Sequence, residues 1–585
     1  MTVRPSLPDL AGQYAGLILS AAVIASLMIV SLLSGNFGQI GPDGDDAMRL
    51  LQVRELLDGK GWFDLTQPRL GPEGGTEMHW SRLVDLPIAL LTLLMSPPLG
   101  REQALNAAIT AWPMLSVLIV TSGLVYGARA LGGRGLLLFA GLLGFLVLFR
   151  HFRFLPGAID HHNLQLGLVL LAAVCLLAKQ RSPAAVAVSG AALALAAAVG
   201  GEVYVFVAAI AGFVALDWAF SGAPAQRSAV IFGAAFAATL TAAFLATVSP
   251  LEYGVIHCDA LSLVSLLAGL GGGAGFALAV QLTSARTRDV RLAALGGVAI
   301  LCAVIVLMLG PQCLSNPLSG LSPEAKTLWL ARVDEARPTF ELWATQPDEV
   351  LFRLATTLLG LSAAAYLAWK GMHRRAMLLF VLLLTISLIL ALYQTRFYVF
   401  GQLFTVLPLA AFVAKLQSGE IGAGLPRPVY LFALLAGVPM MWAALGLSLS
   451  PKPAATGMAA AACYTAETSA MLSRLAPGRV LAPPTDTPRL LLETPHSALH
   501  GHYHRNTAGI DAALAIFTSP PDEARLDLAA AQVDYVFFCA ADPDLKFFAR
   551  HAPDGLIGRM SAGEVPDWLE PAARMGDASL YRVRL

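Results

Sequence analysis

The stretch YAGLILSAAVIASLMIVSLL, residues 14–33, is apolar from end to end and is long enough to cross a lipid bilayer as one helix. It is followed by GPDGDDAMRLLQVR, residues 41–54, in which three carboxylates stand close to two arginines. No small-residue cleavage site follows the apolar segment, so we interpret it as an anchor rather than a removed signal peptide. The start of the chain therefore predicts a membrane protein with acidic side chains where it leaves the bilayer.

The composition supports this interpretation. Of the 585 residues, 56% are hydrophobic and 13% are charged, whereas soluble proteins have about 45–50% apolar and about 25% charged residues. A formal net charge of +0 gives no reason to expect nucleic-acid binding. The six cysteines form no CxxC pair, which argues against a zinc ribbon or a redox motif. Disulfides among Cys258, Cys313, Cys463 and Cys539 remain open.

Apolar runs of spanning length recur along the chain. We predict about thirteen spans, near 14–34, 104–128, 135–152, 164–178, 184–200, 203–220, 228–248, 260–283, 291–309, 350–369, 376–394, 397–415 and 428–449. Basic residues gather on alternate connections, which places the N-terminus, with Arg4, in the cytoplasm. The connections 35–103 and 310–349 are then large outward loops. Within the first of them, the apolar run 83–99 contains three prolines, which suits an interfacial or re-entrant helix.

The composition changes after residue 450. Residues 451–462 are small, and charge and proline then become more frequent. The pattern predicts strands at 480–481, 533–539 and 580–585 and helices at 466–475 and 521–531. We therefore expect an all-α polytopic membrane domain over 1–450 and a small α/β soluble domain over 451–585 on the periplasmic side.

Polar residues gather on the predicted outward side, and each group has two interpretations. The carboxylates Asp43, Asp45 and Asp46 suit either a helix cap, with Asp45 and Asp46 at the N-cap, or a divalent-cation site. The sequence FRFLPGAIDHHNLQ, residues 152–165, contains Asp160, His161 and His162. These residues suit either a helix start that Asp160 caps, with two surface histidines, or a functional site. The sequence LARVDEARPTFEL, residues 330–342, reads as a solvated helix end, and Arg396 in YQTRF as an interfacial side chain.

Taken in order, these motifs resemble the catalytic-subunit family of oligosaccharyltransferases, within the GT-C superfamily of membrane glycosyltransferases. The shared features are an acidic motif in a long first outward loop, G-x-x-D-H-H at 157–162, V-D-E-x-x-P at 333–338, R-F at 396–397 and a soluble domain after the spans. The family's W-W-D-Y-G acceptor motif is absent, because residues 451–470 contain no tryptophan. This departure argues against transfer to an asparagine sequon.

The resemblance implies roles for individual residues. Asp46, Asp160 and His162 would hold a divalent cation, Mg²⁺ or Mn²⁺. Asp46, with Asp45 as its near rival, and Glu335 would be catalytic, and Arg396 would contact the phosphate of the donor. We expect further substrate contacts from Arg49, His79, Trp80, His161, Tyr503 and His504.

The predicted function is that of an integral membrane glycosyltransferase. It would move a sugar or glycan from a polyprenyl-phosphate or polyprenyl-diphosphate donor to a polysaccharide, lipid or protein acceptor at the outer face of a bacterial plasma membrane. The alternative is a transporter or lipid-carrier flippase, which would need ionisable residues near the bilayer midplane and two related halves, and the sequence shows neither. A polymerase or ligase that uses the same donors without metal is a third possibility.

Overall fold

The computed structural model describes residues 7–315, 318, 320–422, 424–426, 428–449 and 463–584. The expectations for Arg4 and for the segment 451–462 lie outside these residues. The chain forms two compact units. The first comprises Met1–Gly41, Trp80–Pro317 and Arg337–Pro451, and the second comprises Pro42–His79, Leu318–Ala336 and Lys452–Leu585. The second unit thus combines the tail with one segment from each of the two large outward loops.

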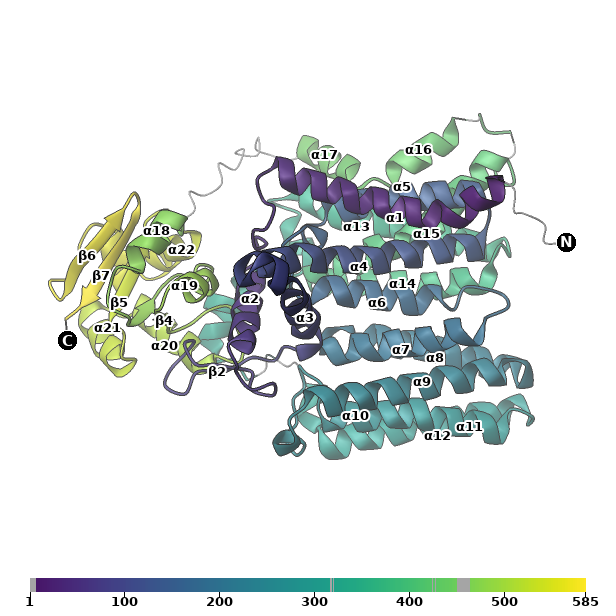
Figure 1. Cartoon of the computed structure of the whole chain (residues 1–585), viewed down its shortest axis with the longest axis horizontal. Coiled ribbons are helices and arrows are strands. Elements are labelled where there is room, and N and C mark those ends of the chain that lie inside the picture. Colours follow the sequence, from purple (N-terminus) through teal and green to yellow (C-terminus); the bar gives the residue numbers. More distant parts are fainter. Residues whose placement is uncertain are drawn as a thin grey trace. The chain divides into compact units, whose positions relative to one another are not determined.

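The first unit is a bundle of helices, most of which run back and forth side by side, while α3 lies across one end of them (Figure 1). Its helices are α1 (Leu7–Leu33), α3 (Arg82–Leu99), α4 (Arg101–Leu131), α5 (Arg134–Arg150), α6 (His162–Val174), α7 (Pro183–Val199), α8 (Tyr204–Ser221), α9 (Ala223–Thr247), α10 (Leu263–Leu270), α11 (Phe276–Thr283), α12 (Arg288–Leu309), α13 (Pro347–Trp369), α14 (Arg374–Tyr393), α15 (Tyr398–Ser418), α16 (Val429–Ala436) and α17 (Pro439–Leu449). A π-helical turn at Gly271–Gly275 joins α10 to α11.

The described residues contain ten helices long and apolar enough to cross a membrane, or eleven if the bent pair α16 and α17 is one span. The helices α5, α6 and α7 are apolar but shorter. Each of the thirteen predicted spans coincides with one helix of the first unit, with α10 and α11 together, or with α16 and α17 together. This agreement confirms the polytopic all-α class. The proline-containing run 83–99 forms one helix, α3, and is among the ten.

Helix α15 is enclosed by its neighbours over most of its length, since every residue from Val399 to Ala411 is buried. Glycines allow α13 to approach it closely. A Cβ on Gly401 would lie 2.5 Å from the Thr357 hydroxyl oxygen, and a Cβ on Gly360 would collide with the Thr405 side chain in the same way. This close packing fixes the middle of α13 against the N-terminal part of α15. Helix α12, in contrast, has no buried residue, as expected of a helix that faces lipid.

The second unit contains a five-stranded sheet in the order β4-β3-β5-β7-β6. Strands β3 (Arg479–Leu481), β4 (Ser497–Ala498) and β5 (Tyr535–Cys539) are parallel, and β6 (Leu569–Met575) and β7 (Ala578–Val583) are antiparallel additions. The helices of the tail are α18 (Ala466–Leu472), α19 (Thr487–Glu493), α20 (Thr507–Thr518), α21 (Pro521–Ala530), α22 (Pro543–His551) and α23 (Leu556–Ser561). The expected α/β tail is therefore confirmed.

The two loop segments of the second unit are attached to the tail by specific contacts. The first contains α2 (Gly44–Leu57) and the hairpin β1 (Thr66–Gln67) and β2 (Thr76–Glu77). The guanidinium of Arg69 in this segment donates to the carbonyls of Leu491 at 2.6 Å and Thr494 at 2.8 Å. The second segment places a hydroxyl of Ser322 2.6 Å from a carboxylate oxygen of Asp511. Loop residues therefore complete this unit.

Four of the six cysteines form disulfides. Cys258 pairs with Cys313 inside the first unit, and Cys463 pairs with Cys539 inside the second. Cys175 and Cys302 are free and lie within or next to apolar helices. All four paired cysteines belong to segments that the charge pattern predicts to face outward.

Candidate functional site

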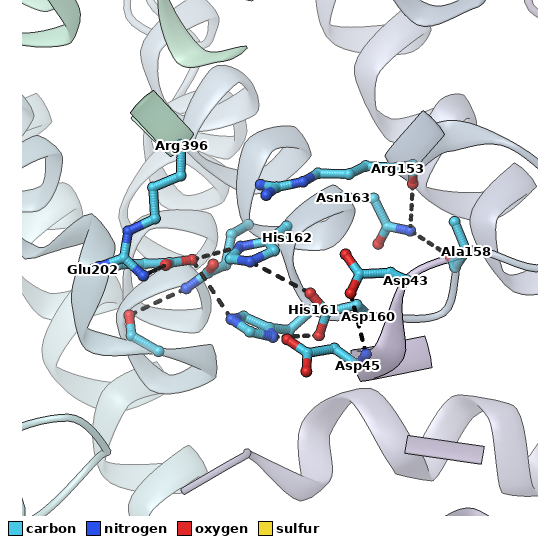
Figure 2. A network of polar contacts seen from close by, with 12 residues as sticks. Asp43, Asp45, Arg153, Ala158, Asp160, His161, His162, Asn163, Glu202 and Arg396 are labelled. Atoms are coloured by element: carbon cyan, nitrogen blue, oxygen red, sulfur yellow. Dashed lines mark hydrogen bonds and ion pairs between the residues drawn. The ribbon is translucent and has the colours of Figure 1, made fainter. Parts of the chain in front are cut away.

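Four ionisable side chains of the first unit form a compact cluster (Figure 2). The Nδ1 atom of His161 lies 2.6 Å from Oδ1 of Asp160, and Nε2 of His162 lies 3.4 Å from Oδ2 of the same carboxylate. The carboxylate of Glu202 closes the cluster, 2.8 Å from Nδ1 of His162 and 3.5 Å from Nε2 of His161. Asp160, His161 and His162 are each less than one tenth exposed.

The loop before α6 is held so that these side chains meet. Gly157 adopts a φ of +92°, and a Cβ there would lie 2.3 Å from the carbonyl oxygen of Gln39, so only glycine fits. Its own carbonyl accepts from Gly41 N at 2.8 Å. The buried amide of Asn163 donates to the carbonyls of Arg153 at 3.1 Å and Ala158 at 2.8 Å. The loop is therefore fastened at both ends around Asp160.

Glu202 comes from the turn η2 (Gly201–Val203) between α7 and α8. The amide of Gln165, one turn into α6, donates to the Gly200 carbonyl at 3.2 Å and ties this turn to the start of α6. Glu202 lies between the predicted spans 184–200 and 203–220, and it was not among the site residues predicted from the sequence. The available signal was an acidic residue placed between two apolar spans on the same side as Asp160.

Arg396 lies in the turn η10 (Thr395–Phe397) between α14 and α15. Its Nη1 is 3.7 Å from Oε2 of Glu202, and its Nη2 donates to the Gln394 side chain at 3.0 Å. About a third of the side chain is exposed. The structure therefore brings together Asp160, His161, His162 and Arg396, which were predicted, and connects them through Glu202, which was not.

Electrostatics keep the cluster partly protonated. Burial lowers the pKa of His161, but the carboxylates of Asp160 and Glu202 outweigh burial and raise it to about 10. An imidazolium therefore balances part of the negative charge of the two carboxylates. Bound metal replaces such protons, because an imidazole ligand must be neutral.

The cluster fits a divalent cation. Asp160, His161 and His162 each offer a ligand atom, and these atoms lie within 4.8 Å of one another. A carboxylate oxygen with imidazole nitrogens suits Mn²⁺ and related ions better than Mg²⁺, which prefers oxygen ligands.

The acidic motif of the first outward loop lies in the second unit. Asp43 is the N-cap of α2, and its carboxylate accepts from Asp45 N at 3.1 Å, so the cap is Asp43 and not Asp45 or Asp46. Asp45 is half-buried, Asp46 is 1% exposed and Arg49 is completely buried. Glu335 is half-buried in a turn of the same unit. The predicted roles of Asp45, Asp46, Arg49 and Glu335 stay predictions.

Two predicted substrate-contact residues of the second unit meet. The rings of His79 and His504 lie 4.6 Å apart. Beside His504, Arg505 pairs with Glu77 at 3.1 Å. Tyr503 is nearly fully buried. In the first unit, the Trp80 ring lies 6.5 Å from that of His161 and is also buried.

The other histidines of the segment 496–504 do not share one face, because β4 ends at Ala498. His496 bonds the Leu472 carbonyl at 2.9 Å, and His500 packs on Phe517. His502 accepts a hydrogen bond from the indole of Trp329 at 2.9 Å. These three side chains have separate structural partners.

The helical bundle, with its polar cluster at the helix ends and a tail that contains a sheet, has a fold that is also found in solved structures. It is similar to the oligosaccharyltransferase of Archaeoglobus fulgidus in the apo form, with a TM-score of 0.67 and 14% identity over 92% of this chain and 70% of that chain. The same protein, AglB, in complex with an inhibitory peptide and a dolichol-phosphate matches with a TM-score of 0.65 and 14% identity over 97% and 73%. Its complex with Zn and sulfate matches with a TM-score of 0.60 and 15% identity over 93% and 70%.

No family model matches the sequence, and no protein of curated function matches it. At such low identity, the similarity to the archaeal structures establishes the fold, which confirms the predicted resemblance at that level.

Proposed function

We propose that this protein is an integral membrane glycosyltransferase that transfers a sugar or glycan from a polyprenyl-phosphate or polyprenyl-diphosphate donor to an acceptor at the outer face of a bacterial plasma membrane. The observation that carries the proposal is the cluster of Asp160, His161, His162 and Glu202 beside Arg396, at the helix ends of a GT-C fold. The complex of AglB with a dolichol-phosphate supports a lipid-linked donor. A transporter would instead need such groups near the bilayer midplane.

Asp160 and His162 would hold a divalent cation, with His161 beside them and Asp46 contributed by the first outward loop. A divalent cation, when bound, supplies positive charge that stabilises a departing phosphate. The complex of AglB with Zn supports a divalent ion.

Other side chains of this protein bind the donor, orient the site and accept the proton of the acceptor. Arg396 binds the donor phosphate, because a guanidinium pairs with phosphate oxygens through parallel hydrogen bonds. Glu202 orients both Arg396 and His162, since its two carboxylate oxygens face one each. Asp46 or Asp45 accepts the proton of the acceptor nucleophile, and Glu335 supports the same site.

The acceptor, a polysaccharide, lipid or protein, is proposed to meet the donor on the outer side, near Tyr503, His504 and His79. Two disulfides support this topology, because they persist in oxidising compartments such as the periplasm. Both lie in segments for which the positive-inside rule predicts the same side.

The test is direct cation binding together with donor turnover by the full-length protein in detergent. Binding of Mn²⁺ is measured by electron paramagnetic resonance, and release of the carrier lipid is followed with undecaprenyl-phosphate-linked and undecaprenyl-diphosphate-linked sugars. Asp160→Asn should abolish both, and Glu202→Gln should weaken Mn²⁺ binding about 10- to 100-fold, as loss of a ligand's hydrogen-bond partner does elsewhere.

Glu341→Gln is the matched control, because Glu341 is an exposed carboxylate in another turn of the first unit. It should bind Mn²⁺ like the unmodified protein. Unchanged Mn²⁺ binding and carrier release in Asp160→Asn would contradict the proposed function.

A further inference from the structure

A loop of the first unit is cross-linked to the end of α12. The loop, residues 248–262, connects α9 to α10, and Cys258 within it forms the disulfide with Cys313. Cys313 lies in the turn η5 (Pro311–Leu314), directly after α12. Helices α9, α10 and α12 lie side by side (Figure 1). The disulfide therefore adds a covalent link between segments that emerge from neighbouring helices.

Apolar packing does little to hold this loop. None of residues 249–260, all of which the structure describes, is buried. The Ser262 hydroxyl donates to the His257 carbonyl at 2.7 Å, and Ser262 N donates to the Ser265 hydroxyl at 2.9 Å, which fastens the loop where it enters α10. Segments with few buried apolar contacts open locally at low cost. We therefore expect the position of Cys258 to depend on its disulfide.

The backbone of this loop lies against the turn that carries Glu202. A Cβ on Gly201 would be only 3.3 Å from the carbonyl oxygen of Cys258. No side chain of Gly201 separates the two backbones, because glycine has none. The preceding Gly200 carbonyl accepts a hydrogen bond from the Gln165 amide at 3.2 Å. The turn is therefore in contact with both α6 and the disulfide-linked loop.

Glu202 has to be placed accurately, because one carboxylate serves several partners (Figure 2). Its oxygens lie 2.8 Å from His162 Nδ1, 3.5 Å from His161 Nε2 and 3.7 Å from Arg396 Nη1. A site of this kind must be held to within about 0.5 Å by the residues around it. A loop that withdraws from Gly201 removes a contact that restricts the turn. The Glu202 carboxylate then samples positions beyond hydrogen-bond distance of His162.

We propose that the Cys258–Cys313 disulfide is a clamp that positions Glu202 in the cation cluster. The disulfide keeps the backbone of Cys258 against Gly201, and the turn keeps the Glu202 carboxylate beside the histidines. Cys258 and Cys313 act through the turn rather than as ligands, so they are positioning residues. The clamp rests on the proposed function, because it concerns the cation proposed to bind this cluster.

The experiment measures the Mn²⁺ affinity of the full-length protein in detergent by electron paramagnetic resonance, in a double-mutant cycle. The double variant Cys258→Ser/Cys313→Ser should bind Mn²⁺ about tenfold more weakly, as mutation of the groups that support metal ligands does elsewhere. When Glu202→Gln is added, binding should match that of Glu202→Gln alone within about twofold, because both changes act through one carboxylate.

Hydrogen exchange gives a second readout that needs no metal. The amides of Glu202 and Val203 should exchange faster in Cys258→Ser/Cys313→Ser than in the unmodified protein. The matched control is Cys175→Ala/Cys302→Ala, which removes two cysteines that form no disulfide. This control should leave both Mn²⁺ affinity and exchange unchanged.

Unchanged Mn²⁺ affinity in Cys258→Ser/Cys313→Ser would overturn the clamp. Losses that multiply when Glu202→Gln is added would also overturn it, because the disulfide would then act independently of that carboxylate. If the double variant does not fold, the disulfide is opened by reduction and iodoacetamide capping in a folded chain that keeps only these two cysteines, and the same criterion applies. An unmodified protein that does not bind Mn²⁺ would count against the proposed function, and the exchange comparison would then decide the clamp.

Discussion

At the scale of single residues, Glu202 shows how a residue in a short turn can connect the other members of a site. The motif Asp160-His161-His162 is contiguous, so its proximity is set by the chain itself. Glu202 is 40 residues away from His162, yet its carboxylate lies 2.8 Å from that ring. One carboxylate therefore joins the histidines to Arg396, and the cluster depends on how α6, α7 and α15 pack.

The pH dependence of the tail is a prediction at the same scale. Burial, and then the Asp542 carboxylate, raises the pKa of Asp486 from 3.8 to about 7, against the effect of Arg489. Between about pH 4 and 7 the folded state therefore binds a proton that the unfolded state has released. The stability contributed by this carboxyl is greatest at the acidic end of that range and falls as the pH rises through 7.

Hydrogen exchange of the α19 amides in the full-length protein tests this expectation, after correction for the intrinsic rates. Protection should decrease between pH 5 and 8, and Asp486→Asn should remove most of that decrease. Asp522→Asn, at an exposed position of α21, should behave like the unmodified protein. A pH dependence that survives in Asp486→Asn would contradict the assignment.

At the scale of elements, the segment 318–336 is held on the tail by side chains. Arg332 pairs with Asp544 at 2.6 Å and lies 4.1 Å above the Phe547 ring, while Trp329 donates to His502. Both charged partners are partly exposed, so the ion pair and the ring contact together contribute about 1 kcal/mol. These contacts add to the burial of Leu321, Ala325, Leu328 and Trp329 in the hydrophobic core of the same unit.

Arg332→Gln should increase hydrogen exchange across the π-helical turn Ala325–Trp329 about five- to tenfold, which corresponds to a loss of about 1 kcal/mol. Glu324→Gln, an exposed position beside that turn, serves as the control and should leave exchange unchanged. Exchange equal to that of the unmodified protein in Arg332→Gln would show that apolar packing alone holds the segment.

At the scale of the whole molecule, the disulfides allow the topology to be tested. Cys258, Cys313, Cys463 and Cys539 should react with a membrane-impermeant maleimide on intact spheroplasts only after reduction, in a chain that carries Cys175→Ala and Cys302→Ala. Labelling in the absence of reductant would contradict the pairing. Labelling that requires lysis of the spheroplasts would reverse the proposed orientation.

The sequence by itself determined the order of the spans, the α/β character of the tail and the Asp160-His161-His162 part of the site. These features are local, since apolar length, strand alternation and neighbouring side chains are all readable along one stretch of chain. Only the tertiary structure decided that Glu202 and Arg396 join that motif, and that 42–79 and 318–336 belong with the tail. Those contacts join residues tens to hundreds of positions apart, and they form only when the helices pack and the loops find hydrogen-bond partners.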